Sequence, residues 1–318
     1  MNGENKGMNR LFFRQYLIYL RIVEDPMKKR VLFIIIGILL VFGGSLFGQE
    51  YQLVYNEGDV FVKQGSGWMM INPGDFLPEN SMVRVGDGAI AEFASSSETI
   101  LFSKPGTYQL KSVMQQKQQK HVAGLSSVFS RVAKIGSTGD QGQSQVMGVR
   151  AAEAEDEYEF TWVEEDTLSF DEAVAAYNRQ EYASAIDIFE NEVDPMLLND
   201  EGAYWFYLAS SYLNIDRKGP ALQIALNHEV NEYSSVFPDF LLLRGRLFLE
   251  SFDYAQAAAQ FEEYIDGVDS PAQLQLGNFL YGYALQQNGD ISGGREALNR
   301  AVEINADSEV TELARQFL

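Results

Sequence analysis

The residue types that usually carry catalysis or bind metals are scarce in this sequence. It contains no cysteine, which excludes a disulfide framework, a thiolate metal site and a thiol nucleophile. Its two histidines, His121 and His228, have no acidic partner at the spacing that metal ligands require. The sequence has no P-loop, no G-x-S-x-G elbow and no EF-hand loop. We therefore expect a protein that is not an enzyme and that uses no cofactor or metal.

Two other patterns imitate chemical sites but lack the surroundings that those sites need. The acidic pairs in residues 262–263 and 164–166 could suggest glycoside cleavage, but adjacent residues of a helix face different directions. Residues 86–91 fit the G-x-G-x-x-A pattern of a dinucleotide site, which needs a helix directly downstream. Because Glu92 and a serine run follow without helical periodicity, residues 86–91 predict a hairpin turn.

Acidic residues are concentrated in the second half of the chain. Residues 49–150 contain 9 acidic and 9 basic residues, whereas residues 151–318 contain 33 acidic and 8 basic residues, a net charge of −25. So negative a surface repels nucleic-acid phosphates and anionic lipid headgroups. We expect no nucleic-acid partner, whereas basic proteins and cations remain open.

The N-terminal region has the pattern of an export signal. Basic residues 28–30 precede residues 31–48, which carry no charge. This order is typical of a signal peptide, which we assign to residues 27–48. An uncleaved membrane anchor remains open, although the run is slightly short of the ~20 apolar residues that span a bilayer. Residues 1–26 are a misassigned start or a short cytoplasmic tail, and the remainder is expected in the periplasm or cell envelope.

Residues 51–150 show the alternation of short β-strands. Short runs rich in apolar residues, typical of strands, occur at residues 60–62, 82–85, 89–93, 99–102 and 108–110. Glycine, proline and aspartate separate these runs and favour chain reversals at residues 58–59, 72–75, 86–88 and 104–106. So many short strands at close spacing predict a small sandwich or roll.

The glycine and apolar positions of this module resemble those of the periplasmic FecR-like domain. The positions that carry the resemblance are Gly58, Val60, Trp68, Gly74, Asp75, Leu77, Val83, Gly88, residues 89–93, Ile100, Phe102, Tyr108 and Leu110. Residues 146–150 are similar to the Val-Arg-Gly stretch that closes many such domains, but Ala151-Ala152 stands where the family usually has Gly-Thr. The family's sigma-factor regulation needs a cytoplasmic N-terminal domain, for which residues 1–26 are too short. We expect the module to dock to the envelope or to a second partner.

The second half of the chain repeats itself. Small residues Ala173, Ala209, Gly245 and Gly282 recur at intervals of 36, 36 and 37 residues. The same pattern of residues follows each of them, and in the first unit it is Tyr182-x-x-Ala185-x-x-x-Phe189. This pattern resembles the tetratricopeptide repeat, in which small residues let paired helices approach and an aromatic side chain fills the remaining gap. We expect an acidic linker at residues 151–165 and a helical solenoid at 166–318, and so an α+β multidomain chain.

In tetratricopeptide proteins, ligands usually lie in a groove lined by the first helix of each repeat. Carried over by register, the groove positions are Phe170, Val174, Tyr177, Phe206, Ser210, Leu213, Asn214, Leu242, Arg246, Leu249, Phe279, Tyr283 and Gln286. This set is largely apolar and aromatic with one cation, which suits an amphipathic or C-terminal peptide segment. The alternative is that several of them, notably Leu213 and Leu242, only complete packing between repeats.

The sequence therefore predicts an exported scaffold or adaptor that binds a protein partner through the groove. Two alternatives remain open. One is a membrane-anchored signalling or regulatory component, if residues 31–48 are uncleaved. The other is a protein that binds cell-wall carbohydrate through the β module, with Trp68 and Tyr108 as stacking surfaces.

Overall fold

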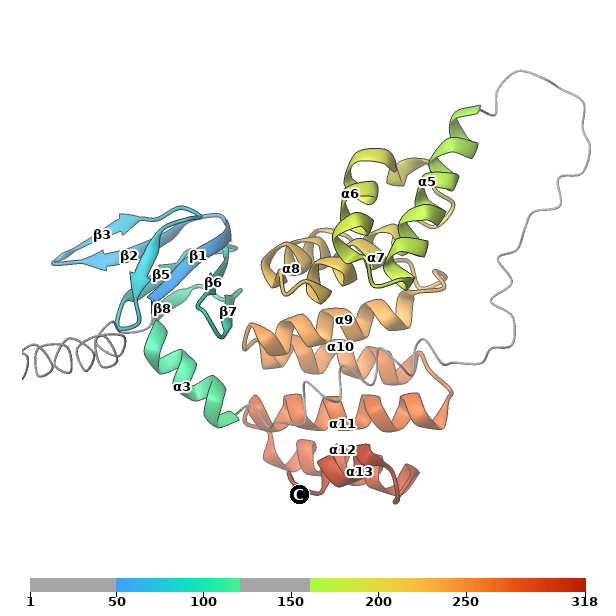
Figure 1. Ribbon diagram of the computed structural model, residues 1–318. Helices are drawn as coiled ribbons and strands as arrows, with labels where there is room; N and C mark the ends of the chain where they lie inside the picture. Colours follow the sequence, from blue (N-terminus) through green and yellow to red (C-terminus); the bar gives the residue numbers. More distant parts are fainter. Residues whose placement is uncertain (1–49, 121–160) are drawn as a thin grey trace, which may run out of the picture. The chain divides into compact units, whose positions relative to one another are not determined.

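The computed structural model describes residues 50–120 and 161–318, a β region followed by a helical region (Figure 1). The α+β fold class is confirmed: strands occupy the first of these ranges and helices the second. The extension at residues 1–26, the signal or anchor segment at 27–48 and most of the acidic linker lie outside the described residues. Within the described ranges, no helix has both the length and the apolar character needed to cross a membrane.

The β region consists of two four-stranded sheets. Their strand orders are β4-β1-β6-β7 and β3-β2-β5-β8, and neighbouring strands pair antiparallel wherever their register is defined. The strands are β1 (Glu50–Glu57), β2 (Val60–Gln64), β3 (Gly67–Met70), β4 (Phe76–Pro78), β5 (Met82–Val85), β6 (Ile90–Ala94), β7 (Thr99–Phe102) and β8 (Gly106–Gln109). Helix α3 (Leu110–Lys120) follows directly.

The predicted strands are confirmed, with small shifts at their ends. The runs at 82–85 and 99–102 coincide with β5 and β7, and the run at 60–62 lies within β2. Leu110 is the exception, because it begins helix α3 instead of ending a strand. Strands β1, β3 and β4 were not predicted from the sequence. The reversals at Gly58, Gly74 and Gly88 have φ angles of 75°, 103° and 70°, which glycine adopts without steric cost.

Strands β6 and β7 are buried on both faces. Phe93 and Ile100, which pair across the two strands, belong to the apolar core of the β region. Ile90 and Leu101 instead belong to the apolar core of the helical region. Because both faces of β7 pack on apolar cores, this strand is apolar at three consecutive positions, Ile100 to Phe102, and shows no alternation.

The helical region is a series of paired helices, each packed against the next. The helices are α5 (Thr161–Asn178), α6 (Tyr182–Glu192), the 3-10 helix η1 (Pro195–Leu197), α7 (Glu201–Asn214), α8 (Lys218–Asn227), α9 (Phe237–Glu250), α10 (Tyr254–Asp266), α11 (Pro271–Gln287), α12 (Ile291–Ile304) and α13 (Glu309–Ala314). Four helix pairs, α5–α6 to α11–α12, correspond to the four sequence repeats, and α13 closes the series (Figure 1). The chain thus has a tetratricopeptide-like helical solenoid.

The small anchor residues lie where paired helices cross. Ala173 and Ala209 are both 0% exposed. A Cβ atom added to Gly245 would lie 2.4 Å from a ring carbon of Phe261, and one added to Gly282 would lie 2.7 Å from the carbonyl oxygen of Gly294. Real Cβ contacts are essentially never this short, so these crossings require glycine.

The turns inside the helix pairs repeat with the same period. Gln180, Asp216, Phe252 and Gly289 all have positive φ angles, and their positions recur at intervals of 36, 36 and 37 residues. Each lies just after the first helix of its pair, where a left-handed residue ends a helix and reverses the chain. The repeat is therefore present in the backbone conformation as well as in the side chains.

We predict that Gly245→Ala lowers the free energy of unfolding by about 1–3 kcal/mol, because the new methyl group overlaps Phe261. Urea denaturation followed by circular dichroism measures the change. Gly267→Ala is the matched control, since its Cβ would meet nothing closer than 3.6 Å. Equal stabilities of the two variants would contradict the close crossing at Gly245.

Candidate functional site

The predicted groove positions differ in exposure. Ser210, Leu213, Leu242, Phe279 and Tyr283 are buried. Those that are partly exposed are Phe170, Val174, Tyr177, Phe206, Arg246, Leu249 and Gln286, and Asn214 is exposed. Only the partly exposed and exposed residues can contact a partner without a structural change, so a smaller set carries the predicted role. That role stays a prediction.

Aromatic side chains from α5 and α7 form one cluster. The ring of Tyr207 lies 6.4 Å from Phe170, 5.1 Å from Tyr177 and 5.2 Å from Phe206, measured between centroids. We call these four residues the aromatic cluster. Tyr177 is also hydrogen-bonded to Ser210 of α7. Tyr207 was not predicted from the sequence. It follows Phe206 directly and so does not fall on one of the repeat positions that were assigned to the groove.

Asp239, in the first turn of α9, is near enough to two tyrosines of this cluster for its charge to affect them. Burial raises the pKa of Tyr207, and the negative charge of Asp239 raises it further. Burial likewise raises the pKa of Tyr177 to about 12, with a smaller contribution from Asp239. Asp239 is itself partly buried, and burial raises the pKa of its carboxyl group. In the described part of the chain, this carboxylate has neither a hydrogen bond nor an ion pair.

Arg246, the only cation among the predicted groove residues, lies beside acids of the array. Burial lowers the pKa of its guanidinium, whereas the charges of Glu250 and Asp216 raise it. Tyr177 contributes a smaller effect in the same direction. Arg246 is thus near Tyr177 and two carboxylates.

The C-terminal residues cover the groove positions of the fourth repeat. The ring of Phe317 lies 6.3 Å from Phe279 and 5.2 Å from Tyr283. Gln286 Nε2 donates a hydrogen bond of 3.0 Å to the carbonyl oxygen of Phe317. With Phe317 in place, Phe279 and Tyr283 are not available to a partner. Among the described residues, the partly exposed groove positions other than Gln286 therefore lie on α5, α7 and α9, and we call them, with the aromatic cluster, the groove face.

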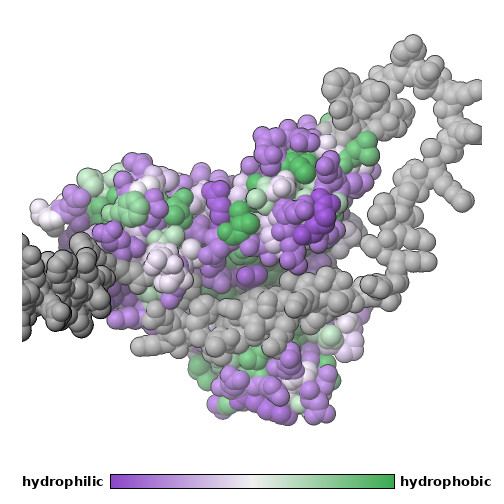
Figure 2. Space-filling model, in the orientation of Figure 1, coloured by the Kyte–Doolittle hydropathy of each residue, from purple (hydrophilic) through white to green (hydrophobic). Residues whose placement is uncertain are grey.

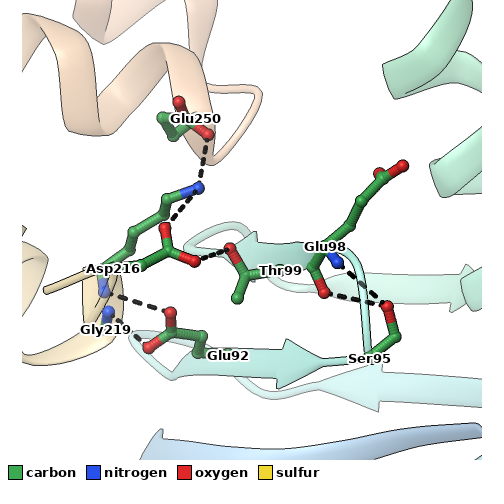
Figure 3. A network of polar contacts seen from close by, with 8 residues as sticks. Glu92, Ser95, Glu98, Thr99, Asp216, Gly219 and Glu250 are labelled. Atoms are coloured by element: carbon green, nitrogen blue, oxygen red, sulfur yellow. Dashed lines mark hydrogen bonds and ion pairs between the residues drawn. The ribbon is translucent and has the colours of Figure 1, made fainter. Parts of the chain in front are cut away.

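A buried carboxylate joins the β region to the helical region. Glu92 of β6 is 1% exposed and accepts hydrogen bonds from the backbone N–H groups of Lys218 (3.1 Å) and Gly219 (2.9 Å), shown in Figure 3. These are the first two residues of α8, which has no side-chain cap of its own. Arg217 stands where α10 and α12 have the capping residues Asp253 and Asp290. Glu92 therefore supplies the anionic partner that a helix N-terminus favours.

Further contacts connect the β region to the turns of the second and third repeats. Lys104 forms a 2.8 Å ion pair with Asp253, and Ser103 Oγ donates a 2.8 Å hydrogen bond to Ser251 Oγ. Tyr55 donates a hydrogen bond to Gln223. A Cβ atom on Gly219 would lie 2.3 Å from the ring of Tyr55, so this position of α8 requires glycine.

Lys218 adds an ion-pair network to this junction. Its ammonium group lies 3.1 Å from a carboxylate oxygen of Glu250 and 3.3 Å from one of Asp216 (Figure 3). Asp216 also accepts a 3.4 Å hydrogen bond from Thr99 of β7. The charges of Glu250 and Asp216 raise the pKa of Lys218 against the opposing effect of burial.

His228 takes part in packing. Its ring stacks on Trp205 with 3.4 Å between centroids, and burial lowers its pKa. Trp205 lines an open cavity of about 410 Å³ with Tyr212, whose hydroxyl donates a hydrogen bond to Glu190. Because these rings and polar groups already have partners, the cavity offers few free contacts to a ligand. Within the described ranges, no group of three or more acidic or histidine side chains could hold a metal ion.

The proposed stacking residues of the β module are already in contact with other side chains. The guanidinium of Arg84 lies 4.0 Å from the ring centre of Trp68. Tyr108 packs on Phe102 at 4.5 Å, and its hydroxyl donates to the carbonyl oxygen of Lys104. Elsewhere in the module, the side chain of Phe76 is 64% exposed. On the face shown in Figure 2, hydrophobic residues form separate patches among hydrophilic ones.

No family model and no curated protein matches the chain. Among solved structures, it is similar to "MamA RS-1 ArsTM double mutant", with 14% identity, a TM-score of 0.39, and coverage of 48% of this chain and 83% of that chain. It is also similar to "MamA 41-end from Desulfovibrio magneticus RS-1", with 14% identity, a TM-score of 0.36, and coverage of 48% and 90%.

We predict that Glu92→Gln destabilises the protein by about 1–3 kcal/mol. The glutamine amide has one oxygen where the carboxylate has two, so its NH₂ group would face a backbone N–H that now donates to a carboxylate oxygen. Thermal and urea unfolding measure the loss. Glu57→Gln, which alters an exposed residue of β1, is the control and should leave stability unchanged. An unchanged stability in Glu92→Gln would show that this carboxylate does not hold the junction.

We predict that Asp239→Asn is more stable than the wild type at neutral pH. A carboxyl group whose pKa is raised on folding binds more protons in the folded state, so wild-type stability falls as pH rises from 3.8 through the folded pKa. Asparagine lacks this dependence. The difference in unfolding free energy between variant and wild type, measured at pH values from 4 to 8, should therefore grow with pH. A difference that shrinks would show that the folded protein stabilises the carboxylate.

Proposed function

We propose that this chain is an exported, non-enzymatic scaffold that holds a protein partner on the groove face of its helical solenoid. The observation that carries the proposal is the aromatic cluster, whose four side chains remain partly exposed on α5 and α7 beside Asp239. Partly exposed aromatic residues on a rigid surface are typical anchors of protein interfaces.

The β region is the second part of this proposal. It is a FecR-like module that docks to the envelope or to a second partner, and the junction at Glu92 connects such docking to the solenoid. Export to the periplasm or cell envelope is supported by the basic residues 28–30 and the uncharged run at 31–48. The net charge of −25 in residues 151–318 favours a protein partner with basic character.

We predict that Phe206→Ala weakens partner binding by about 2 kcal/mol, roughly thirtyfold, because truncation removes an aromatic anchor from the groove face. The partner is recovered with tagged full-length wild type from the cells that produce it, and its affinity for each variant is then measured by calorimetry.

Tyr233→Ala is the control, because Tyr233 is 86% exposed on the loop between α8 and α9. It should bind like the wild type, and thermal unfolding of both variants shows whether they remain folded. If folded Phe206→Ala retains full affinity, the partner does not use the groove face.

A further inference from the structure

We propose that the groove face binds the cationic side chain of a lysine or arginine in its partner on Asp239, next to the aromatic cluster. This inference rests on the proposed function and adds the chemistry of the partner. Asp239 is not among the positions predicted for the groove, and its charge affects tyrosines of two other repeats.

The geometry of the site comes from three successive first helices. Tyr177 is on α5, Tyr207 on α7 and Asp239 on α9, and the rings of Tyr177 and Tyr207 lie 5.1 Å apart. Asp239 is near enough for its charge to act on both tyrosines and on Tyr264 of α10. Because these residues belong to packed helices, the site exists before a partner arrives.

The chemistry of the site favours a cation. Among the described residues nothing hydrogen-bonds to the Asp239 carboxylate or pairs with it, although the group is partly buried. A partly buried carboxylate without a donor is stabilised when a guanidinium or ammonium group reaches it. Tyrosine and phenylalanine rings attract the same cations through their negative faces, and their edges accept the apolar stem of lysine or arginine.

The surrounding charge points to the same partner. The cation of the groove face, Arg246, lies beside Glu250 and Asp216 and so adds little net positive charge. The whole array is strongly acidic, which attracts basic segments and repels acidic ones during encounter. A matching segment has one basic residue flanked by apolar residues, which pack on Phe170 and Phe206.

A selection from a random peptide library displayed on phage tests the proposal. The immobilised full-length proteins are wild type, Asp239→Asn, and Asp266→Asn, a control with the same change of charge at an exposed position of α10. We expect peptides selected on wild type and on Asp266→Asn to share a lysine or arginine at one aligned position between apolar residues. Peptides selected on Asp239→Asn should lack it.

The selected peptide is then synthesised with its basic residue and with glutamine in that place, and affinities are measured by fluorescence anisotropy. We expect Asp239→Asn to weaken binding of the basic peptide by about tenfold, and glutamine in the peptide to have no further effect on that variant. A merely structural role for Asp239 would weaken both peptides equally, and that result would overturn the proposal.

Two other results would also overturn it. Peptides with a basic residue selected equally well on Asp239→Asn would show that another group binds the cation, while the proposed function would stand. No enrichment on any of the three proteins would remove the proposed function too, and would favour a groove face occupied by the chain itself or by a second copy.

Discussion

The close approach of paired helices at small residues is the constraint on which the solenoid depends. At Gly245 and Gly282 a side chain of even one carbon would overlap the neighbouring helix. Helices held this near each other exclude water from the aromatic residues that fill the adjacent space, such as Phe189 and Phe261, both 0% exposed. The same spacing recurs in the left-handed turns, so one packing rule determines both the side chains and the backbone of every repeat.

The junction between the β region and the solenoid depends on a different interaction. Removing a carboxylate from water is costly, and burial raises the pKa of Glu92; the two backbone N–H groups at the start of α8 that donate to it offset part of this cost. The helix gains from the same contact, since it lacks the capping aspartate of α10 and α12. Each side thus satisfies a polar group that the other leaves unpaired, and the described residues from Tyr51 onward belong to one compact unit.

Within the described ranges, the aromatic cluster and Asp239 remain partly exposed, whereas two other parts of the solenoid are covered. Phe317 covers the fourth repeat, and Lys104, Ser103 and Tyr55 contact the turns and second helices of the middle repeats. What remains is an aromatic surface beside a carboxylate that has no bonded partner among the residues the structure describes. Because the packing below this surface is rigid, less conformational entropy is lost when a partner binds. This property suits a scaffold.

The repeats, most strands and the glycine turns could be predicted from the order of the residues, because these features are local: periodic spacing shows which residues of one element face its neighbour. The capping of α8 by Glu92 became visible in the folded chain alone, since the two positions lie 126 residues apart and neither segment carries a pattern that points to the other. The roles of Tyr207 and Asp239, and the covering of Phe279 by Phe317, were decided in the same way. Exposure and charge pairing at these residues depend on which elements the folded chain brings together, and hydrophobic periodicity carries no information about that.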